Sequence, residues 1–308
     1  KIQELKDQIA SVIVGQEQTV DLVLTAILAN GHVLIEGVPG VAKTLLARLT
    51  ARLIDADFSR IQFTPDLMPS DVLGTTVFNM KTNEFDFHQG PIFADIVLVD
   101  EINRAPAKTQ AALFEVMEER QISIDGITHK MGELYTILAT QNPVEQEGTY
   151  KLPEAQLDRF LMKITMDYPS LEEEVNILER HHTNASLIKL DDIKPAITKE
   201  ELLSLRALMN QVFVDRTLLQ YIALIVQQTR TSKAVYLGAS PRASVAMLQS
   251  SKAYALLQGR DFVTPEDIKF VAPYVLQHRL ILTAEAEMEG YSPVKVTQRL
   301  IDKVEVPK

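Results

Sequence analysis

The sequence contains no cysteine, and none of its apolar runs is long enough to cross a bilayer. The absence of thiols excludes disulfide bonds and thiolate metal sites, although it does not by itself assign a compartment. A bilayer-spanning helix needs about 18–20 apolar residues, so no membrane insertion is expected. The first residues, Lys1 to Glu4, do not resemble a signal peptide, and a cytoplasmic location is therefore predicted.

Basic residues are scarce relative to acidic ones, with 31 Lys and Arg against 41 Asp and Glu and a net charge of −10. Binding to nucleic acid needs a basic face, so this balance disfavours a nucleic-acid partner, although a motor could still line a pore with a few lysines. Histidines are few and scattered, and only His181 and His182 are adjacent. In a polar stretch such a pair is more often solvated than metal-bound.

The most informative stretch runs from Val33 to Leu53. Its three opening apolar residues predict a buried strand, Gly37 and Gly40 break that strand, and the apolar spacing after Thr44 predicts a helix. A glycine turn between a strand end and a helix N-terminus binds phosphate, because backbone N–H groups and the helix dipole point at the anion. Lys43 can then reach the β- and γ-phosphates, and Thr44 can ligate Mg²⁺.

One residue departs from the phosphate-loop pattern G-x-x-x-x-G-K-[ST]. Ala42 stands where the last glycine should be, and we expect alanine to be tolerated there if residue 42 is already helical. The alternative is a glycine-rich turn followed by a surface lysine.

Two further strands are predicted to end in polar side chains. Ile96 to Val99 reads as a buried strand followed by Asp100 and Glu101, and a strand over residues 134–139 is followed by Asn142. Ligands of α/β sheets bind at the carboxyl ends of strands, so Asp100 is predicted to hold the Mg²⁺ shell and Glu101 to polarise the attacking water. The alternatives are an Asp-Glu pair that begins a helix and an Asn-Pro turn.

The remaining pattern predicts an α/β fold with two domains. A parallel-sheet core with flanking helices would span residues 1–183, and an all-helical C-terminal domain would span residues 184–308. Additional strands are expected at 59–64 and 161–166, hairpins at 75–92 and 122–128, and helices over most of 1–30, 106–120 and 171–180. Arg242 falls in the first turn of a predicted helix, where a cation is unfavourable unless it meets an anion, and solvation at the surface is the alternative.

Together these segments resemble an AAA+ ATPase, and within that class the MoxR group. The residues 37–44 resemble its Walker A loop, alanine included, and the residues 96–101 resemble Walker B. Asn142 matches sensor 1, Arg159 in Asp-Arg-Phe matches the arginine finger, and Arg242 in Ser-Pro-Arg matches sensor 2. The residues 61–71 and 101–106 are also typical of the group, and the two hairpins match its helix-2 and pre-sensor insertions.

The resemblance implies a P-loop core of αβα layers with a parallel sheet, a helical lid, and assembly as a homo-oligomeric ring, usually a hexamer. It implies ATP and Mg²⁺ as cofactors and a remodelling, chaperone-like role on a protein client, in some cases a von Willebrand A-domain protein. It also implies catalytic roles for Glu101, Asn142, Arg159 and Arg242 and metal contacts from Thr44 and Asp100. The implied nucleotide-binding residues are Val14, Gly15, Gly37, Val38, Pro39, Gly40, Val41, Ala42, Lys43, Thr44, Leu45 and Asp100; for Val14 and Gly15 the sequence alone equally allows a helix C-cap.

Two other functions stay open at this point. The chain could be an ATP-gated scaffold with little turnover, although an intact Glu101 and Arg159 count against it. It could also be the motor subunit of a metal chelatase or of a DNA-acting complex, since related AAA+ branches share the hairpins.

Overall fold

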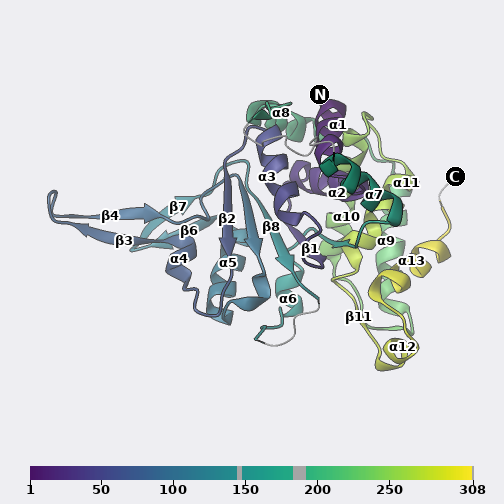
Figure 1. Ribbon diagram of the computed structural model, residues 1–308. Coiled ribbons are helices and arrows are strands. Elements are labelled where there is room, and N and C mark those ends of the chain that lie inside the picture. Colours follow the sequence, from purple (N-terminus) through teal and green to yellow (C-terminus); the bar gives the residue numbers. More distant parts are fainter. Residues whose placement is uncertain (144–147, 183–191, 307–308) are drawn as a thin grey trace. The chain divides into compact units, whose positions relative to one another are not determined.

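The computed structural model describes residues 1–143, 148–182 and 192–306 and divides the chain into two compact units (Figure 1). The first unit comprises Lys1–Val20, Leu34–Leu152 and Thr165–Leu203, and the second comprises Asp21–Val33, Pro153–Ile164 and Ser204–Lys308. The chain therefore enters the second unit three times. The domain boundary predicted between residues 183 and 184 lies outside the described residues and stays a prediction.

A five-stranded parallel sheet forms the centre of the nucleotide-binding fold. Its strand order is β2-β5-β8-β1-β9, so β8 lies between β5 and β1. Unbroken apolar sequence on the central strands fits burial of both faces of a parallel sheet, and β5 is buried at every position. The predicted strands are confirmed, with bounds of Val33–Gly37 for β1, Phe58–Gln62 for β2, Ile96–Asp100 for β5, Thr136–Gln141 for β8 and Met162–Met166 for β9.

Helix α3 (Lys43–Leu53) follows β1 as predicted, and its apolar residues Leu46, Leu49 and Leu53 are completely buried. Their spacing of three and four residues places them on one helix face, which is why this amphipathic segment packs as a helix. The other helical segments along this part of the chain are α1 (Ile2–Val12), α2 (Glu17–Leu28), α4 (Pro69–Leu73), the 3₁₀ turn η1 (Ile102–Arg104), α5 (Ala107–Glu119) and α7 (Leu171–His182). None of the helices in the described ranges is both long enough and apolar enough to span a membrane.

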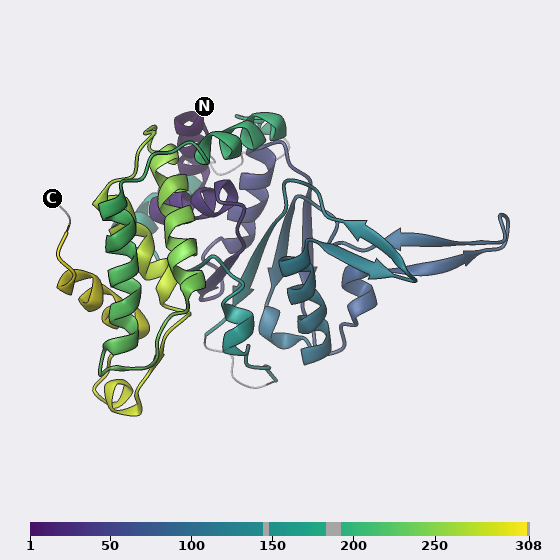
Figure 2. The same ribbon diagram turned by 180° about the vertical axis from the view of Figure 1, so that it is seen from behind.

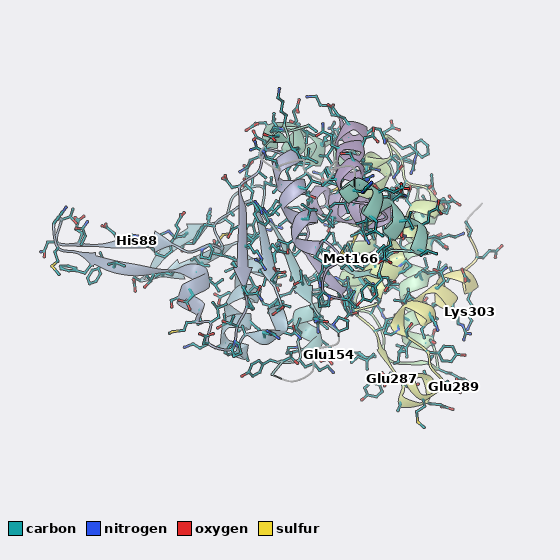
Figure 3. All side chains as sticks on the ribbon, in the orientation of Figure 1. His88, Glu154, Met166, Glu287, Glu289 and Lys303 are labelled. Atoms are coloured by element: carbon teal, nitrogen blue, oxygen red, sulfur yellow. The ribbon has the colours of Figure 1, made fainter. Side chains whose placement is uncertain are left out.

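Both predicted hairpins are present. β6 (Gln121–Ile124) and β7 (Ile127–Lys130) are joined through Asp125 and Gly126, whose φ angles of 52° and 79° are those of a type I′ turn. β3 (Gly74–Asn79) and β4 (Glu84–Gln89) form a longer hairpin that extends well beyond the sheet in both views (Figures 1 and 2). His88 on β4 marks this arm in Figure 3, and the neighbouring Phe87 contacts His129 of β7 at a ring distance of 4.2 Å.

The second unit is mainly helical. Its helices are α6 (Glu154–Leu157), α9 (Arg216–Thr231), α10 (Pro241–Leu257), α11 (Pro265–Leu276), α12 (Ala284–Met288) and α13 (Pro293–Lys303). Two further helices, α2 and α8 (Lys199–Met209), cross the boundary between the units. Capping boxes begin α8 and α11: Thr198 pairs with Glu201, and Thr264 pairs with Asp267.

The prediction that this C-terminal region contains no strand is wrong. β10 (Val235–Leu237) pairs antiparallel with β11 (Ile281–Leu282). Leu282 joins a buried cluster with Ala286, Val296 and Leu300, against which Val235 packs. The partners are more than 40 residues apart in sequence, so a local periodicity cannot predict their pairing.

Candidate functional site: a phosphate loop beside paired carboxylates

The loop between β1 and α3 has two glycines with different surroundings. A Cβ on Gly37 would lie 2.7 Å from the backbone oxygen of Met166 at the end of β9, so only glycine permits this approach of the two backbones. Met166 is labelled in Figure 3. Gly40 has a φ of +88° and nothing within 4 Å of its Cβ position. The loop thus combines one tightly packed glycine with one that borders open space.

Ala42 is not helical, contrary to the sequence-based expectation. It lies in the left-handed region at φ 61° and ψ 23° and is the N-cap residue of α3, which begins at Lys43. Glycine adopts this conformation freely, whereas alanine loses about 1–2 kcal/mol because its Cβ approaches the following carbonyl. Ala42 has no polar side chain, so it makes no capping hydrogen bond to the first N–H groups of α3.

Lys43 lies close to both candidate carboxylates. Its Nζ donates to the backbone oxygen of Gly37 at 2.6 Å. Partial burial lowers the pKa of Lys43 because it removes the ammonium group from water, and the charges of Asp100 and Glu101 oppose that change. The structure therefore brings the loop lysine and the end of β5 together, as the sequence predicted.

Asp100 is held from both neighbouring strands. The residue is 7% exposed, and its Oδ1 accepts a hydrogen bond of 2.9 Å from the Thr140 hydroxyl at the end of β8. Its Oδ2 accepts from Arg60 Nε on β2 at 2.6 Å. A buried carboxylate with both oxygens engaged has a fixed orientation, which suits a ligand of a metal hydration shell.

Glu101 follows Asp100 in a strained left-handed conformation, with φ 55° and ψ 51°. Its backbone N–H donates to the Thr140 hydroxyl at 3.0 Å. Its Oε2 accepts from Gln62 Nε2 at 2.9 Å and lies 3.2 Å from Arg104 Nε. Glu101 is the N-cap residue of the short η1, but the alternative in which this pair only begins a helix does not account for the contacts with Gln62 and Thr140.

Asn142 lies immediately after β8 and is 8% exposed. Because β8 separates β5 from β1, its end lies between the carboxylates and the loop. The structure thus gathers Lys43, Asp100, Glu101 and Asn142 at the carboxyl ends of three adjacent strands.

Sequence reasoning missed four residues of this site: Arg60, Gln62, Arg104 and Thr140. A signal was available for the strand-end residues, since neighbouring parallel strands end at the same edge and Gln62 is in register with Asp100. Choosing the register requires knowledge of which strands are neighbours, and the sequence does not provide it.

Val14 and Gly15 lie between α1 and α2, and both are half-buried. Gly15 has a φ of +73°, and a Cβ there would come within 2.4 Å of the Glu173 carboxyl group. The C-cap of α1 is the extended residue Ile13, so Gly15 is not the residue that terminates this helix. Contact of Val14 and Gly15 with the nucleotide stays a prediction.

Arg159 and Arg242 both belong to the second unit. Arg159 is half-buried in the turn after α6, and Arg242 is exposed in the first turn of α10 with Pro241 before it. Their roles opposite a nucleotide stay predictions.

The residues around Lys43 fit Mg²⁺ and a triphosphate. The described residues contain no group of three His, Cys, Asp or Glu side chains that could enclose a metal ion. Mg²⁺ needs no such cage, because it retains waters and is held by one or two carboxylates together with substrate phosphates. Thr44 in the first turn of α3 and Asp100 are the residues that would hold it, and the uncapped α3 N-terminus suits the phosphates.

Replacing Gly37 by alanine is expected to destabilise the protein by roughly 1–3 kcal/mol, because the new Cβ must push the Met166 backbone away. Gly132→Ala is the matched control, since its Cβ would meet no atom closer than 3.4 Å. Urea denaturation followed by circular dichroism measures both variants. Equal stability of the two would show that the close approach at Gly37 is absent in solution.

Comparison with known proteins supports the same class. The sequence profile of the ATPase family associated with various cellular activities (AAA) matches residues 32–162, and an AAA lid domain profile matches residues 227–302. The uncharacterised Bacillus subtilis protein YeaC is 47% identical over 98% of this chain and 93% of its own length. The Mycobacterium tuberculosis protein named Chaperone MoxR1 is 44% identical over 98% of this chain and 81% of its own.

A solved structure extends the match to three dimensions. A Cytophaga hutchinsonii protein provisionally described as an ATPase superposes with a TM-score of 0.91 at 41% identity, covering 100% of this chain and 95% of that one. The core and lid profiles fall on the sheet-containing and helical parts of the chain respectively. With a phosphate loop, paired carboxylates and near full-length relatives in agreement, the chain belongs to the MoxR family of AAA+ ATPases.

Proposed function

We propose that this protein hydrolyses ATP in a Mg²⁺-dependent reaction and couples the hydrolysis to remodelling or assembly of a protein client. The observation that carries the proposal is the position of Glu101, which is fixed by Gln62 and Arg104 next to Asp100 and within the electrostatic reach of Lys43. A carboxylate held at this place is suited to remove a proton from water beside a bound phosphate.

Each residue of the site has one task in this reaction. Lys43 and the N–H groups of α3 bind the β- and γ-phosphates, and Thr44 and Asp100 hold the metal ion. Mg²⁺, when bound, neutralises charge on the phosphate oxygens. Glu101 accepts the proton as a water oxygen bonds to the γ-phosphorus and the bond to the β-phosphate oxygen breaks, and Asn142 orients that water. Arg159 and Arg242 supply positive charge to the γ-phosphate.

The proposal includes assembly of this chain as a homo-oligomeric, hexameric ring, with Arg159 acting on the nucleotide of the adjacent subunit. It also includes a cytoplasmic location and a protein client, of which a von Willebrand A-domain protein is the first candidate to test. The name of the mycobacterial relative, a chaperone, supports a protein client rather than a nucleic acid. The net charge of −10 supports the same choice.

Glu101→Gln tests the reaction directly. We expect ATP affinity to be retained, because the amide preserves shape, and steady-state phosphate release to fall by about 10²–10⁴-fold, because the proton acceptor is lost. Glu115→Gln is the matched control, since Glu115 is exposed on α5. Wild-type turnover in Glu101→Gln would mean that another group activates the water, and negligible turnover in the unaltered protein would favour an ATP-gated scaffold.

The same variant can identify the client. A form that binds ATP and hydrolyses it slowly should retain its partner longer than the unaltered protein does. A protein that copurifies with Glu101→Gln in the presence of ATP, but not in the presence of ADP, would be the client. Mass spectrometry would identify it. Turnover stimulated by polynucleotide instead of protein would contradict a protein client.

A further inference from the structure

The segment that carries Arg159 is held by side chains from a distant part of the second unit. Residues 153–164 comprise α6, the turn after it and the start of β9, and Glu154, labelled in Figure 3, opens α6. Arg159 N–H donates to Gln156 O at 3.2 Å in the turn that follows. Around that turn, four backbone carbonyls of residues 158–163 accept hydrogen bonds from side chains that directly follow α11, more than 110 residues later.

Three consecutive residues make these contacts, and we call Gln277, His278 and Arg279 the α11 clamp. Gln277 Nε2 donates to Lys163 O. His278 Nε2 lies 3.0 Å from Phe160 O, and because a carbonyl only accepts, Nε2 carries the proton. Burial lowers the pKa of His278 well below its ordinary value, so this neutral donor persists at neutral pH.

Arg279 makes more of the clamp's hydrogen bonds than Gln277 or His278 does. Its side chain is only 4% exposed, and Nε donates to Asp158 Oδ1 at 2.6 Å. Nη2 donates to Asp158 O at 3.1 Å and to Phe160 O at 2.7 Å, and Nη1 donates to Leu161 O at 3.2 Å and also to Val275 O. A buried guanidinium is tolerated only when its donors are satisfied, and here most of its acceptors are residues that flank Arg159.

Arg242 lies within the same electrostatic environment. Burial lowers the pKa of Arg279, the Asp158 carboxylate opposes the change, and the positive charge of Arg242 lowers the pKa further. Arg242 is therefore near enough to Arg279 for their charges to interact, and both residues lie in the second unit together with Arg159.

We propose that the α11 clamp sets the position of Arg159, with Arg279 as its positioning residue, so that contacts within the second unit hold the arginine that acts on the nucleotide. The inference rests on the proposed role of Arg159 and deepens it. It assigns a function to a buried cation of the second unit that has no task in the reaction itself. The rigid fork of arginine is essential to it, because lysine cannot reach several carbonyls at fixed angles.

The first test is turnover in Arg279→Ala and Arg279→Lys. We expect ATP affinity to remain within about twofold of the unaltered protein and turnover to fall by about 10²-fold, the usual loss for a misplaced catalytic group. Arg216→Ala, at an exposed position on α9, is the matched control. If Arg279→Ala does not fold, as judged by circular dichroism, Arg279→Lys and the isosteric Asp158→Asn carry the test, since each weakens the same contact.

Mixing experiments separate positioning from general damage. Arg279→Ala mixed with Lys43→Ala should recover activity, because one parent supplies an intact phosphate loop and the other an intact Arg159 arrangement. Arg279→Ala mixed with Arg159→Ala should recover none, because both parents lack a correctly placed Arg159. Recovery in the second mixture would overturn the inference.

The absence of cysteine permits a direct readout of the segment. A spin label on Ala155→Cys, exposed on α6, should become more mobile in Arg279→Lys, while a label on Ala284→Cys, exposed on α12, should not change. If Arg159→Ala lowers turnover but Arg279→Lys changes neither turnover nor the Ala155 label, the clamp inference is wrong and the proposed function stands. If Glu101→Gln and Arg159→Ala both hydrolyse ATP normally, it is the proposed function that fails.

Discussion

Replacing Arg159 by alanine is expected to leave ATP binding intact and to reduce ATP turnover by about 10³–10⁵-fold, the contribution of an arginine finger in related NTPases. The planar, permanently charged guanidinium can neutralise charge that develops on the transferred phosphoryl group, and alanine cannot. An exposed ion pair contributes only about 0–1 kcal/mol, so a structural role would predict a far smaller effect. Fluorescent-nucleotide titration and phosphate release measure the two quantities separately, with Arg216→Ala as the control.

Mixing Arg159→Ala with Lys43→Ala tests whether Arg159 acts on a neighbouring subunit. In a mixed ring some interfaces pair an intact phosphate loop from one parent with an intact Arg159 from the other, so part of the activity should return. Mass spectrometry of the intact assemblies would establish that mixed rings form. If they form and remain inactive, Arg159 does not act between subunits.

Lys43→Ala should lose ATP binding and, with it, all measurable turnover. A charge-assisted hydrogen bond contributes about 1.5–3 kcal/mol, and the ammonium has enough donors to contact two phosphates, so affinity should fall by about 10²–10⁴-fold. Partial burial strengthens the effect, because water replaces the lost contacts poorly in a desolvated site. Calorimetric titration with ATP in Mg²⁺ measures the loss directly.

Lys108→Ala provides the matched control for this experiment, since Lys108 is exposed near the start of α5. It removes one lysine from the same unit and should bind ATP as the unaltered protein does. Ordinary affinity in Lys43→Ala would remove the basis for assigning the loop to phosphate.

Much of the site could be predicted because its parts are local. The strand, glycine turn and helix around Lys43 lie within 20 residues, and the carboxylates directly follow an apolar strand. Such patterns depend on hydrogen bonding and burial along one short segment, which sequence encodes directly. The type I′ turn at Asp125 and Gly126 was predictable for the same reason, since it requires two consecutive residues that tolerate positive φ.

Other features could not be predicted, because they depend on which distant segments become neighbours. The left-handed conformation of Ala42 follows from the path of the loop into α3 and not from any preference of alanine. The contacts of Gln62 and Thr140 with the carboxylates require β5 to lie between β2 and β8. The amino-acid composition of these strands does not specify that order.

The sequence by itself determined the chemistry of this protein: a phosphate loop, paired carboxylates after a buried strand, and the family to which they belong. Only the tertiary structure decided how those groups are held. Gln62 reaches Glu101 because two strands end in register, and Arg279 reaches the carbonyls around Arg159 because the residues that follow α11 lie beside a segment more than 110 residues earlier. The physical reason is that side-chain identity is a local property, whereas the partner that satisfies a buried charge is selected by packing of the whole chain.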